Sequence, residues 1–235
     1  MEFVKRENEI LTTLNSLLEE ELDFVVVGGY AVSGLGKHRF SVDCDIVISK
    51  LERGKTELVL ERFGFGRDIE KTGFDGTYAG EFVRYKKKVG ELPVTFDLLI
   101  ESLVCRTTNA AWSFEYIKKH SVKAAVTGIE MLANCMIPEK ELMIAFKIHS
   151  ARRTDVRDII VMMENSDFDK VLTHLRRGKE ELLKTQISSI IEMLNDVKLV
   201  DSLKGVFTLT VDVRKQIEET RKFLEKILKR LSYAF

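Results

Sequence analysis

The sequence predicts an α+β fold, in which a small mixed β-sheet with flanking helices is followed by an all-helical C-terminal domain. Two observations predict this division. Short runs rich in β-branched residues and bounded by glycines occupy the first part of the chain. From Pro138 onward, apolar residues recur at helical spacing. We therefore predict one domain over residues 1–137 and a helical domain over residues 138–235.

The first part should begin with an amphipathic helix, because apolar residues recur at helical spacing before residue 24. The run FVVVGG then predicts a buried strand that ends at two glycines. The elements expected after it are a short helix over 30–35, a strand over 42–48, a helix over 52–63, strands over 81–89 and 94–100, and a paired set over 122–126 and 129–132.

The second part should be helical throughout. Pro138 suits the first turn of a helix, and helical periodicity predicts helices over 139–152, 155–164, 179–194 and 211–231. The last of these has an apolar stripe that would be either core or a dimer seam. The stripe consists of Val213, Ile217, Leu224, Leu228 and Leu231.

Composition excludes several classes of protein. Among the 235 residues, Lys+Arg and Asp+Glu both number 37, so the whole molecule has no net attraction to nucleic acid or to an anionic membrane. The three cysteines lie far apart, and the four histidines are scattered, which indicates a reducing, cytoplasmic setting without a disulfide framework or a zinc site. No run approaches the roughly 20 apolar residues that span a bilayer, so we expect no membrane partner.

Two aspartates on the second predicted strand are candidate metal ligands. In Asp43-Cys44-Asp45, the period of two along a strand places both carboxylates on one face, about 7 Å apart. Carboxylates so close repel each other unless a cation intervenes, and such hard oxygen ligands suit Mg²⁺. Taken alone, the pair could equally lie on a solvated strand surface.

A glycine pair upstream makes the metal interpretation more specific. Gly28 and Gly29 lie where the first strand meets the short helix, and glycines there let backbone amides approach a phosphate. A lone glycine pair is usually only a tight turn. Residues 30–42 provide about the length that a short helix and the return to a second strand require, which would bring Asp43 and Asp45 beside the glycines.

The run GGYAVSGLGKHRFSVDCDIVI resembles the motif of the polymerase-beta-like nucleotidyltransferase superfamily. Its Arg39-to-Asp45 portion is more closely similar to the R-x-[ST]-x-D-x-D form of the AbiEii-type and minimal nucleotidyltransferase groups. The family has a third carboxylate on a later strand, and Asp97 in VTFDLLI matches it.

The resemblance continues in AFKIHSARRTDVRDIIVM, which is similar to a downstream helical motif of the family. Lys147 matches a lysine that is expected to contact nucleotide phosphates, and Asp155 and Asp158 match an acidic pair. On an unbroken helix Asp158 would lie about 20° round from Lys147. The two aspartates could equally pair with neighbouring arginines on a solvated surface.

The resemblance implies a nucleotidyltransferase that uses an NTP and two Mg²⁺ ions. Asp43, Asp45 and Asp97 would be the metal ligands and catalytic residues, with Asp97 placed to accept the proton of the acceptor hydroxyl. Nucleotide binding would fall to Gly28, Gly29, Arg39, Ser41, Lys147 and Asp158. Arg39 could instead bridge to Asp45, and Ser41 could be an ordinary strand residue.

The resemblance leaves the acceptor and partners open. A tRNA end, a protein side chain and a small molecule are all acceptors of the family, and the AbiEii-type likeness implies a toxin role in a toxin–antitoxin pair. The helical domain would form the second wall of the cleft, and it could bind a partner protein or form a homodimer. A protein that keeps the fold but only binds a nucleotide or a protein is the alternative from another class.

Overall fold

The computed structural model describes residues 2–207 and 213–232. The chain forms two compact units: the first contains Met1–Val104 and Ala111–Glu139, and the second contains Cys105–Ala110 and Lys140–Phe235. The short loop at Cys105–Ala110 belongs with the helices because Thr108 hydrogen-bonds the buried His149, with an Oγ1–Nδ1 distance of 2.7 Å.

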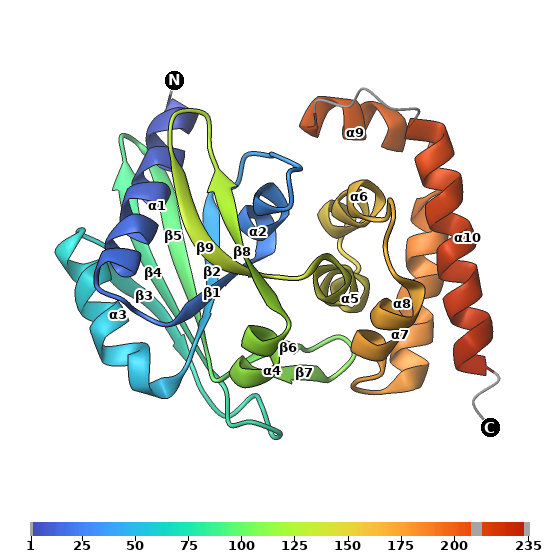
Figure 1. Cartoon of the computed structure of the whole chain (residues 1–235), viewed down its shortest axis with the longest axis horizontal. Helices are drawn as coiled ribbons and strands as arrows, with labels where there is room; N and C mark the ends of the chain where they lie inside the picture. Colours follow the sequence, from blue (N-terminus) through green and yellow to red (C-terminus); the bar gives the residue numbers. More distant parts are fainter. Residues whose placement is uncertain (1, 208–212, 233–235) are drawn as a thin grey trace. The chain divides into compact units, whose positions relative to one another are not determined.

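The first unit is built on a seven-stranded sheet of order β3-β4-β5-β2-β1-β9-β8 (Figure 1). The pairs β2–β5 and β1–β9 are parallel and the other pairs antiparallel, so the sheet is mixed, as the sequence predicts. A two-stranded ribbon, β6–β7, is separate. The strands are β1 Phe24–Val27, β2 Asp43–Ile48, β3 Gly66–Lys71, β4 Glu81–Val89, β5 Leu92–Ile100, β6 Ser102–Cys105, β7 Ala110–Ser113, β8 Ser121–Thr127 and β9 Leu132–Pro138.

Four helices accompany this sheet: α1 Glu2–Glu19, α2 Gly28–Gly34, α3 Lys50–Arg62 and α4 Phe114–Lys119. Helices α1 and α3 lie side by side (Figure 1). The Nζ atom of Lys87 on β4 lies 2.6 Å from a carboxylate oxygen of Glu9 on α1 and 2.7 Å from the carbonyl oxygen of Phe63 after α3. The face of β4 that includes Lys87 is therefore the face that these two helices cover.

Strand alternation separates this helix-covered face from the opposite one. Cys44 on β2 lies level with Phe96 on β5 and Tyr85 on β4, and all three are fully buried. Each large apolar side chain buried in this way contributes about 1.5–3 kcal/mol. Asp43 and Asp45 point from the other side of β2, which we call the carboxylate face. The predicted assignment of Cys44 to the core is thus confirmed.

The second unit consists of helices α5 Lys140–Ser150, α6 Arg153–Met162, α7 Phe168–Leu175, α8 Glu180–Met193, α9 Leu199–Val206 and α10 Val213–Ser232. Helix α10 packs on α8 and α6. Four residues of the predicted apolar stripe, Val213, Ile217, Leu224 and Leu231, are buried there, so they serve as core. The predicted start of this helix, at 211–212, lies outside the described residues.

Several sequence predictions are wrong in detail. Pro138 ends β9 and does not begin a helix, and β8 pairs with a strand over 132–138, not with 129–132. Residue Ala151, with a φ of 49°, separates α5 from α6, so Lys147 and Asp158 are not on one helix. The sequence also missed β3, β6, β7, α4, α7 and α9. The missed strands and α4 are short, or polar in the case of β3, and α7 and α9 have only 8 residues each, which is too few for a periodic pattern to stand out.

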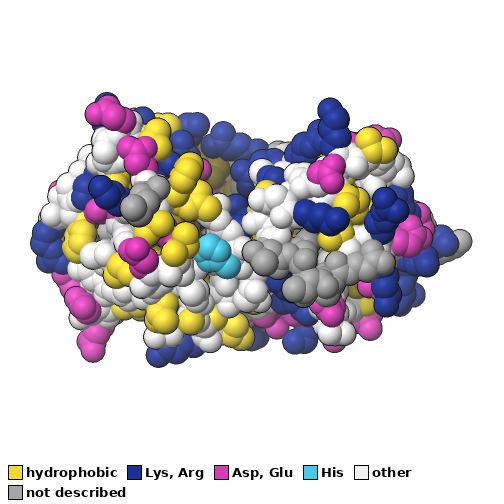
Figure 2. Space-filling view, turned by 90° about the horizontal axis from the view of Figure 1, so that it is seen from above, with side chains coloured by type: hydrophobic (Ala, Val, Ile, Leu, Met, Phe, Trp, Pro, Cys, Tyr) yellow, Lys and Arg dark blue, Asp and Glu magenta, His cyan; other side chains and the backbone are white. Residues whose placement is uncertain are grey.

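The charged side chains on the surface reflect the balanced composition of the chain. Lys and Arg side chains are intermixed with Asp and Glu on the face that Figure 2 shows. Within the described part of the chain, no helix combines the length and the hydrophobicity needed to cross a bilayer.

Candidate active site

The carboxylate face brings the three predicted aspartates together. Asp45 on β2 lies directly beside Asp97 on the parallel neighbour β5, and Val27 of β1 lies on its other side. Asp43 is two residues earlier on β2, level with Thr95. Because neighbouring strands are about 4.8 Å apart and partners in register share a face, the three carboxylates form one acidic group on the sheet.

The three carboxylates differ in their access to solvent. Asp43 is exposed, Asp45 is partly exposed and Asp97 is only 5% exposed. The hydroxyl of Thr95 donates a hydrogen bond of 2.8 Å to Oδ1 of Asp43, which fixes the direction of this side chain. The acidic group is therefore accessible to solvent at Asp43 and buried at Asp97.

Arg84 on β4 is a cation that sequence reasoning did not assign to the site. It lies level with Asp97 in the antiparallel β4–β5 pair. Its Nε and Nη2 atoms donate to Oδ1 and Oδ2 of Asp97, both at 2.7 Å. The pKa of Arg84 is raised above its already high ordinary value, first by the hydrogen bonds to Asp97 and then by the negative charges of Asp97, Asp43 and Asp45. The guanidinium is thus permanently charged and neutralises part of the acidic group.

The glycine turn lies against the acidic group, as predicted. Gly28 has a φ of 67°, which favours glycine, and a Cβ built there would lie 2.1 Å from Oδ2 of Asp45. No side chain larger than hydrogen fits without displacing that carboxylate. The backbone at the β1–α2 junction and the Asp45 carboxylate are therefore in direct contact.

Arg39 and Ser41 lie beside the second glycine. A Cβ on Gly29 would lie 2.7 Å from Oγ of Ser41 and 3.0 Å from Nη2 of Arg39. The loop that positions them is tied to α2, because the buried Tyr30 donates its hydroxyl to the carbonyl oxygen of Ser41 at 3.0 Å. Burial, and then the nearby Cys44, raise the pKa of Tyr30 above its ordinary value, so this donor stays protonated.

The donor set on the carboxylate face fits Mg²⁺. Asp43, Asp45 and Asp97 offer carboxylate oxygens on one face, which is the ligand chemistry that Mg²⁺ prefers. An ionised carboxylate has about four lone-pair sites, so the two bonds from Arg84 leave Asp97 with sites for a metal ligand. At Gly28 the Asp45 carboxylate itself occupies the space that a Cβ would fill, so the backbone and this ligand lie in direct contact.

Lys147 and the acidic pair belong to the second unit, where they contact one another. The Nζ atom of Lys147 lies 2.8 Å from a carboxylate oxygen of Asp155 and 2.8 Å from one of Asp158. All three side chains are buried. Burial alone would raise the pKa of Asp155, but the charges and hydrogen bonds of Lys147 and Arg152 outweigh it and lower that pKa.

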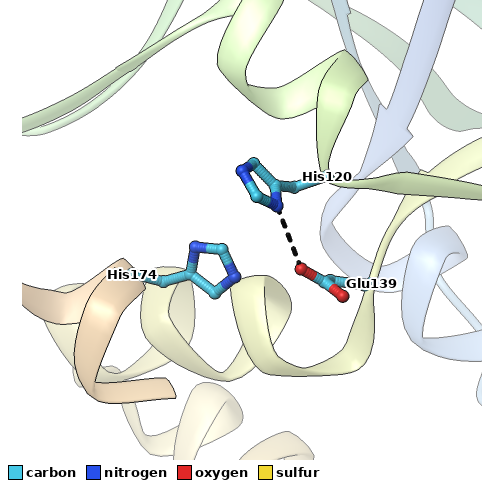
Figure 3. Close-up of side chains that lie close together, drawn as sticks. All are labelled: His120, Glu139 and His174. Carbon is cyan, nitrogen blue, oxygen red and sulfur yellow. Dashed lines mark hydrogen bonds and ion pairs between the residues drawn. The ribbon is translucent and has the colours of Figure 1, made fainter. Parts of the chain in front are cut away.

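Two histidines of the protein form hydrogen bonds within their own units. The Nδ1 atom of His120, at the end of α4, lies 3.2 Å from Oε1 of Glu139 (Figure 3), and the backbone N–H of Glu139 donates to the His120 carbonyl oxygen at 2.8 Å. These contacts join α4 to the end of β9. The buried His149 accepts at Nδ1 from Thr108 and donates at Nε2 to the carbonyl oxygen of Leu175, 3.1 Å away. Burial lowers its pKa to about 4.

The residues that sequence reasoning missed are Arg84, Thr95 and Tyr30. Arg84 could have been found from the alternation of β4, once the register with β5 was known, because both strands were correctly predicted. Nothing local in the sequence distinguishes Thr95 or Tyr30 from other residues of a strand or helix.

Of the comparisons with known proteins, one solved structure supports the fold. No protein-family model matches the chain, and no curated protein is similar enough to count as a relative. The crystal structure of JHP933 from Helicobacter pylori is similar, with a TM-score of 0.50 and 16% identity, over 98% of this chain and 93% of that one. The structure of ANT(2″)-Ia in complex with adenylyl-2″-tobramycin has a TM-score of 0.48 and 17% identity, over 75% of this chain and 93% of that one.

Proposed function

We propose that this protein is a Mg²⁺-dependent nucleotidyltransferase, which moves an NMP unit from an NTP to an acceptor hydroxyl and releases pyrophosphate. The observation that supports this most is the direct pairing of Asp45 with Asp97 on neighbouring parallel strands, with Asp43 next to them. Three carboxylates on one sheet face repel one another, and a divalent cation relieves that repulsion. When bound, Mg²⁺ would neutralise charge on the triphosphate and acidify the acceptor hydroxyl.

In this reaction the oxygen of the acceptor hydroxyl forms a bond to the α-phosphorus, and the bond from that phosphorus to the pyrophosphate oxygen breaks. Asp43 and Asp45 would hold the metal, and Asp97 would both bind metal and take the hydroxyl proton. Arg84 orients Asp97 by binding both of its oxygens. Such catalysis is mostly positioning and charge neutralisation, so few side chains are needed.

The triphosphate would lie at the glycine turn. Gly28 and Gly29 allow phosphate oxygens to approach the backbone, and the Arg39 guanidinium beside Gly29 supplies a cation there. Ser41, which donates to the carbonyl oxygen of Asp43 at 3.1 Å, keeps the loop close to β2. We infer that these residues bind the nucleotide from the β1 side of the acidic group.

The role of Lys147 in phosphate binding stays a prediction. Its ammonium group is already held by two buried carboxylates, which favours a role in stabilising the helical unit. A phosphate contact would require Lys147 to give up at least one of these ion pairs, which costs several kcal/mol when a buried charge is left unpaired.

The test is pyrophosphate release from each NTP in Mg²⁺, with total RNA, protein and small-molecule fractions supplied as acceptors. The Asp45→Asn variant is the control, since it removes a ligand charge but keeps the side-chain shape. We expect release by the wild type, none without Mg²⁺, and none by the variant. Equal release by wild type and variant would refute the metal role.

A non-catalytic nucleotide- or protein-binding role is the second candidate, and one observation favours it. The two-point contact of Arg84 already compensates Asp97 without any metal. Such a protein would bind an NTP and release no pyrophosphate with any acceptor.

An AbiEii-type relationship and a toxin role are further parts of the proposal, and they rest on the run from Arg39 to Asp45. Growth arrest on expression of the wild type, but not of Asp45→Asn, would support the toxin role. Equal growth with the two proteins would count against it.

A further inference from the structure

Strand β4 places a row of cations on the carboxylate face. Arg84, Lys86 and Lys88 alternate along the strand, and in the register with β5 they lie level with Asp97, Thr95 and Pro93. Partners in register share a face, so all three cations project from the same side of the sheet as the aspartates.

Lys86 and Lys88 differ from the other cations of this strand. Lys87, between them, points to the helix-covered face, where Glu9 and the carbonyl oxygen of Phe63 hold it. Arg84 is occupied by Asp97. The side chains of Lys86 and Lys88 are exposed, and neither forms a hydrogen bond or ion pair with any residue in the ranges 2–207 and 213–232. Two unneutralised charges, about 6.7 Å apart along the strand, therefore lie beside the acidic group.

The lysines and the glycine turn lie on opposite sides of the aspartates, so each can bind a different ligand. The glycine turn follows β1, and β4 lies on the other side of the pair β2–β5 that carries the aspartates. A nucleotide at Gly28 and Gly29 therefore occupies the β1 side, and the β4 side is left for the acceptor. Lys86 is level with Asp43, and Lys88 is one step farther away.

We propose that Lys86 and Lys88 bind the phosphodiester backbone of a single-stranded nucleic acid, whose terminal hydroxyl is the acceptor at the carboxylates. This inference rests on the proposed function. A chain that leaves the carboxylates and runs along β4 passes first Lys86 and then Lys88, and a phosphodiester backbone presents a negative charge at every repeat.

The experiment measures binding of fluorescein-labelled 12-nucleotide RNA and DNA strands with a free 3′-hydroxyl, across a series of salt concentrations. The full-length wild type is compared with Lys86→Gln/Lys88→Gln. The control is Lys55→Gln/Lys123→Gln, which changes the net charge equally at exposed lysines of α3 and β8.

Loss of two phosphate contacts should reduce the slope of log K against log salt by about 1.4. We expect this change, and about tenfold weaker binding at low salt, in the β4 variant alone. Equal slopes and affinities in the two double variants would overturn the inference, as would the absence of binding by the wild type. The strand that binds more tightly, RNA or DNA, identifies which nucleic acid the lysines bind.

A second measurement separates this inference from the proposed function. The affinity for Mg²⁺ with ATP should be equal in the two double variants, because the nucleotide lies on the β1 side. A loss of ATP affinity in the β4 variant, with unchanged strand binding, would place the lysines at the triphosphate and overturn the inference. The wild type could also bind strands through these lysines and release no pyrophosphate with any acceptor. That result would refute the proposed nucleotidyl transfer but retain Lys86 and Lys88 as a strand-binding site.

Discussion

Arg84 binds Asp97 through two parallel hydrogen bonds of 2.7 Å, at the buried end of an acidic group formed by Asp43, Asp45 and Asp97. The contact orients the least accessible carboxylate of the group and compensates its charge. The two bonds leave lone pairs on Asp97 that a divalent cation would bind.

Replacing Arg84 by Met should make the protein depend more strongly on Mg²⁺ for stability. Without its partner the buried Asp97 carboxylate is left uncompensated, which costs about 1–3 kcal/mol in the metal-free protein. A bound cation should restore part of this loss. The measurement is the melting temperature as a function of Mg²⁺ concentration for the wild type and Arg84→Met. Identical Mg²⁺-induced shifts in the two proteins would show that Arg84 and the metal do not share Asp97.

Substituting Gly28 by Ala should abolish nucleotidyl transfer and lower stability. The new Cβ would meet Oδ2 of Asp45 at 2.1 Å, and the left-handed backbone adds about 1–2 kcal/mol of strain. Gly36→Ala is the matched control, because Gly36 also has a positive φ, of 80°, but its Cβ would meet nothing within 4 Å. Pyrophosphate release and melting temperature are measured for both. The prediction fails if the two variants retain equal activity.

Replacing Lys147 by Met should destabilise the helical unit by about 3–5 kcal/mol, because Asp155 and Asp158 would keep buried charges without their cation. The triple variant Lys147→Met/Asp155→Asn/Asp158→Asn should recover part of the loss, since it removes the charges together. Chemical denaturation provides the free energies of unfolding. A Lys147→Met variant with wild-type stability but weak ATP binding would instead support the predicted phosphate contact.

Acidification should destabilise the second unit through His149. Its pKa is lowered by burial to about 4, from an ordinary value near 6.5. Below pH 6.5 the unfolded chain takes up a proton that the folded protein refuses, so stability is lost as the pH falls toward 4. At pH 5 the loss amounts to about 2 kcal/mol. The melting temperature of His149→Gln should therefore fall less between pH 7 and pH 5 than that of the wild type. Equal decreases in the melting temperatures of the two proteins would show that other groups cause the acid sensitivity.

The local pattern of the chain was sufficient for the central part of the site. The period of two in Asp43-Cys44-Asp45 correctly placed one side chain in the core and two on the opposite face. The glycine pair at the end of β1 was correctly expected beside these aspartates, since a short helix and a return strand have a limited reach. Both inferences depend only on the geometry of a few consecutive residues.

The predicted helices of the second part were wrong where contacts between residues distant in the sequence decide the structure. Lys147 and Asp158 form an ion pair that was not predicted, and they come from two helices separated by Ala151 and not from one helical face. The periodicity of the sequence is unchanged by a two-residue break, so periodicity alone cannot locate it. The loop around Thr108 likewise belongs to the helical unit because of its bond to His149, some forty residues away.

The sequence by itself determined the mixed sheet, the following helices and the three aspartates, because strand and helix periods are local properties of the backbone. Only the tertiary structure decided which side chains are neighbours across strands. The register of β4 on β5 pairs Arg84 with Asp97 and sets Lys86 beside Thr95, level with Asp43 on the next strand. A slip of one residue would turn every side chain of β4 to the other face. The packing of Val83 and Tyr85 in the core selects the register that brings these cations to the carboxylates.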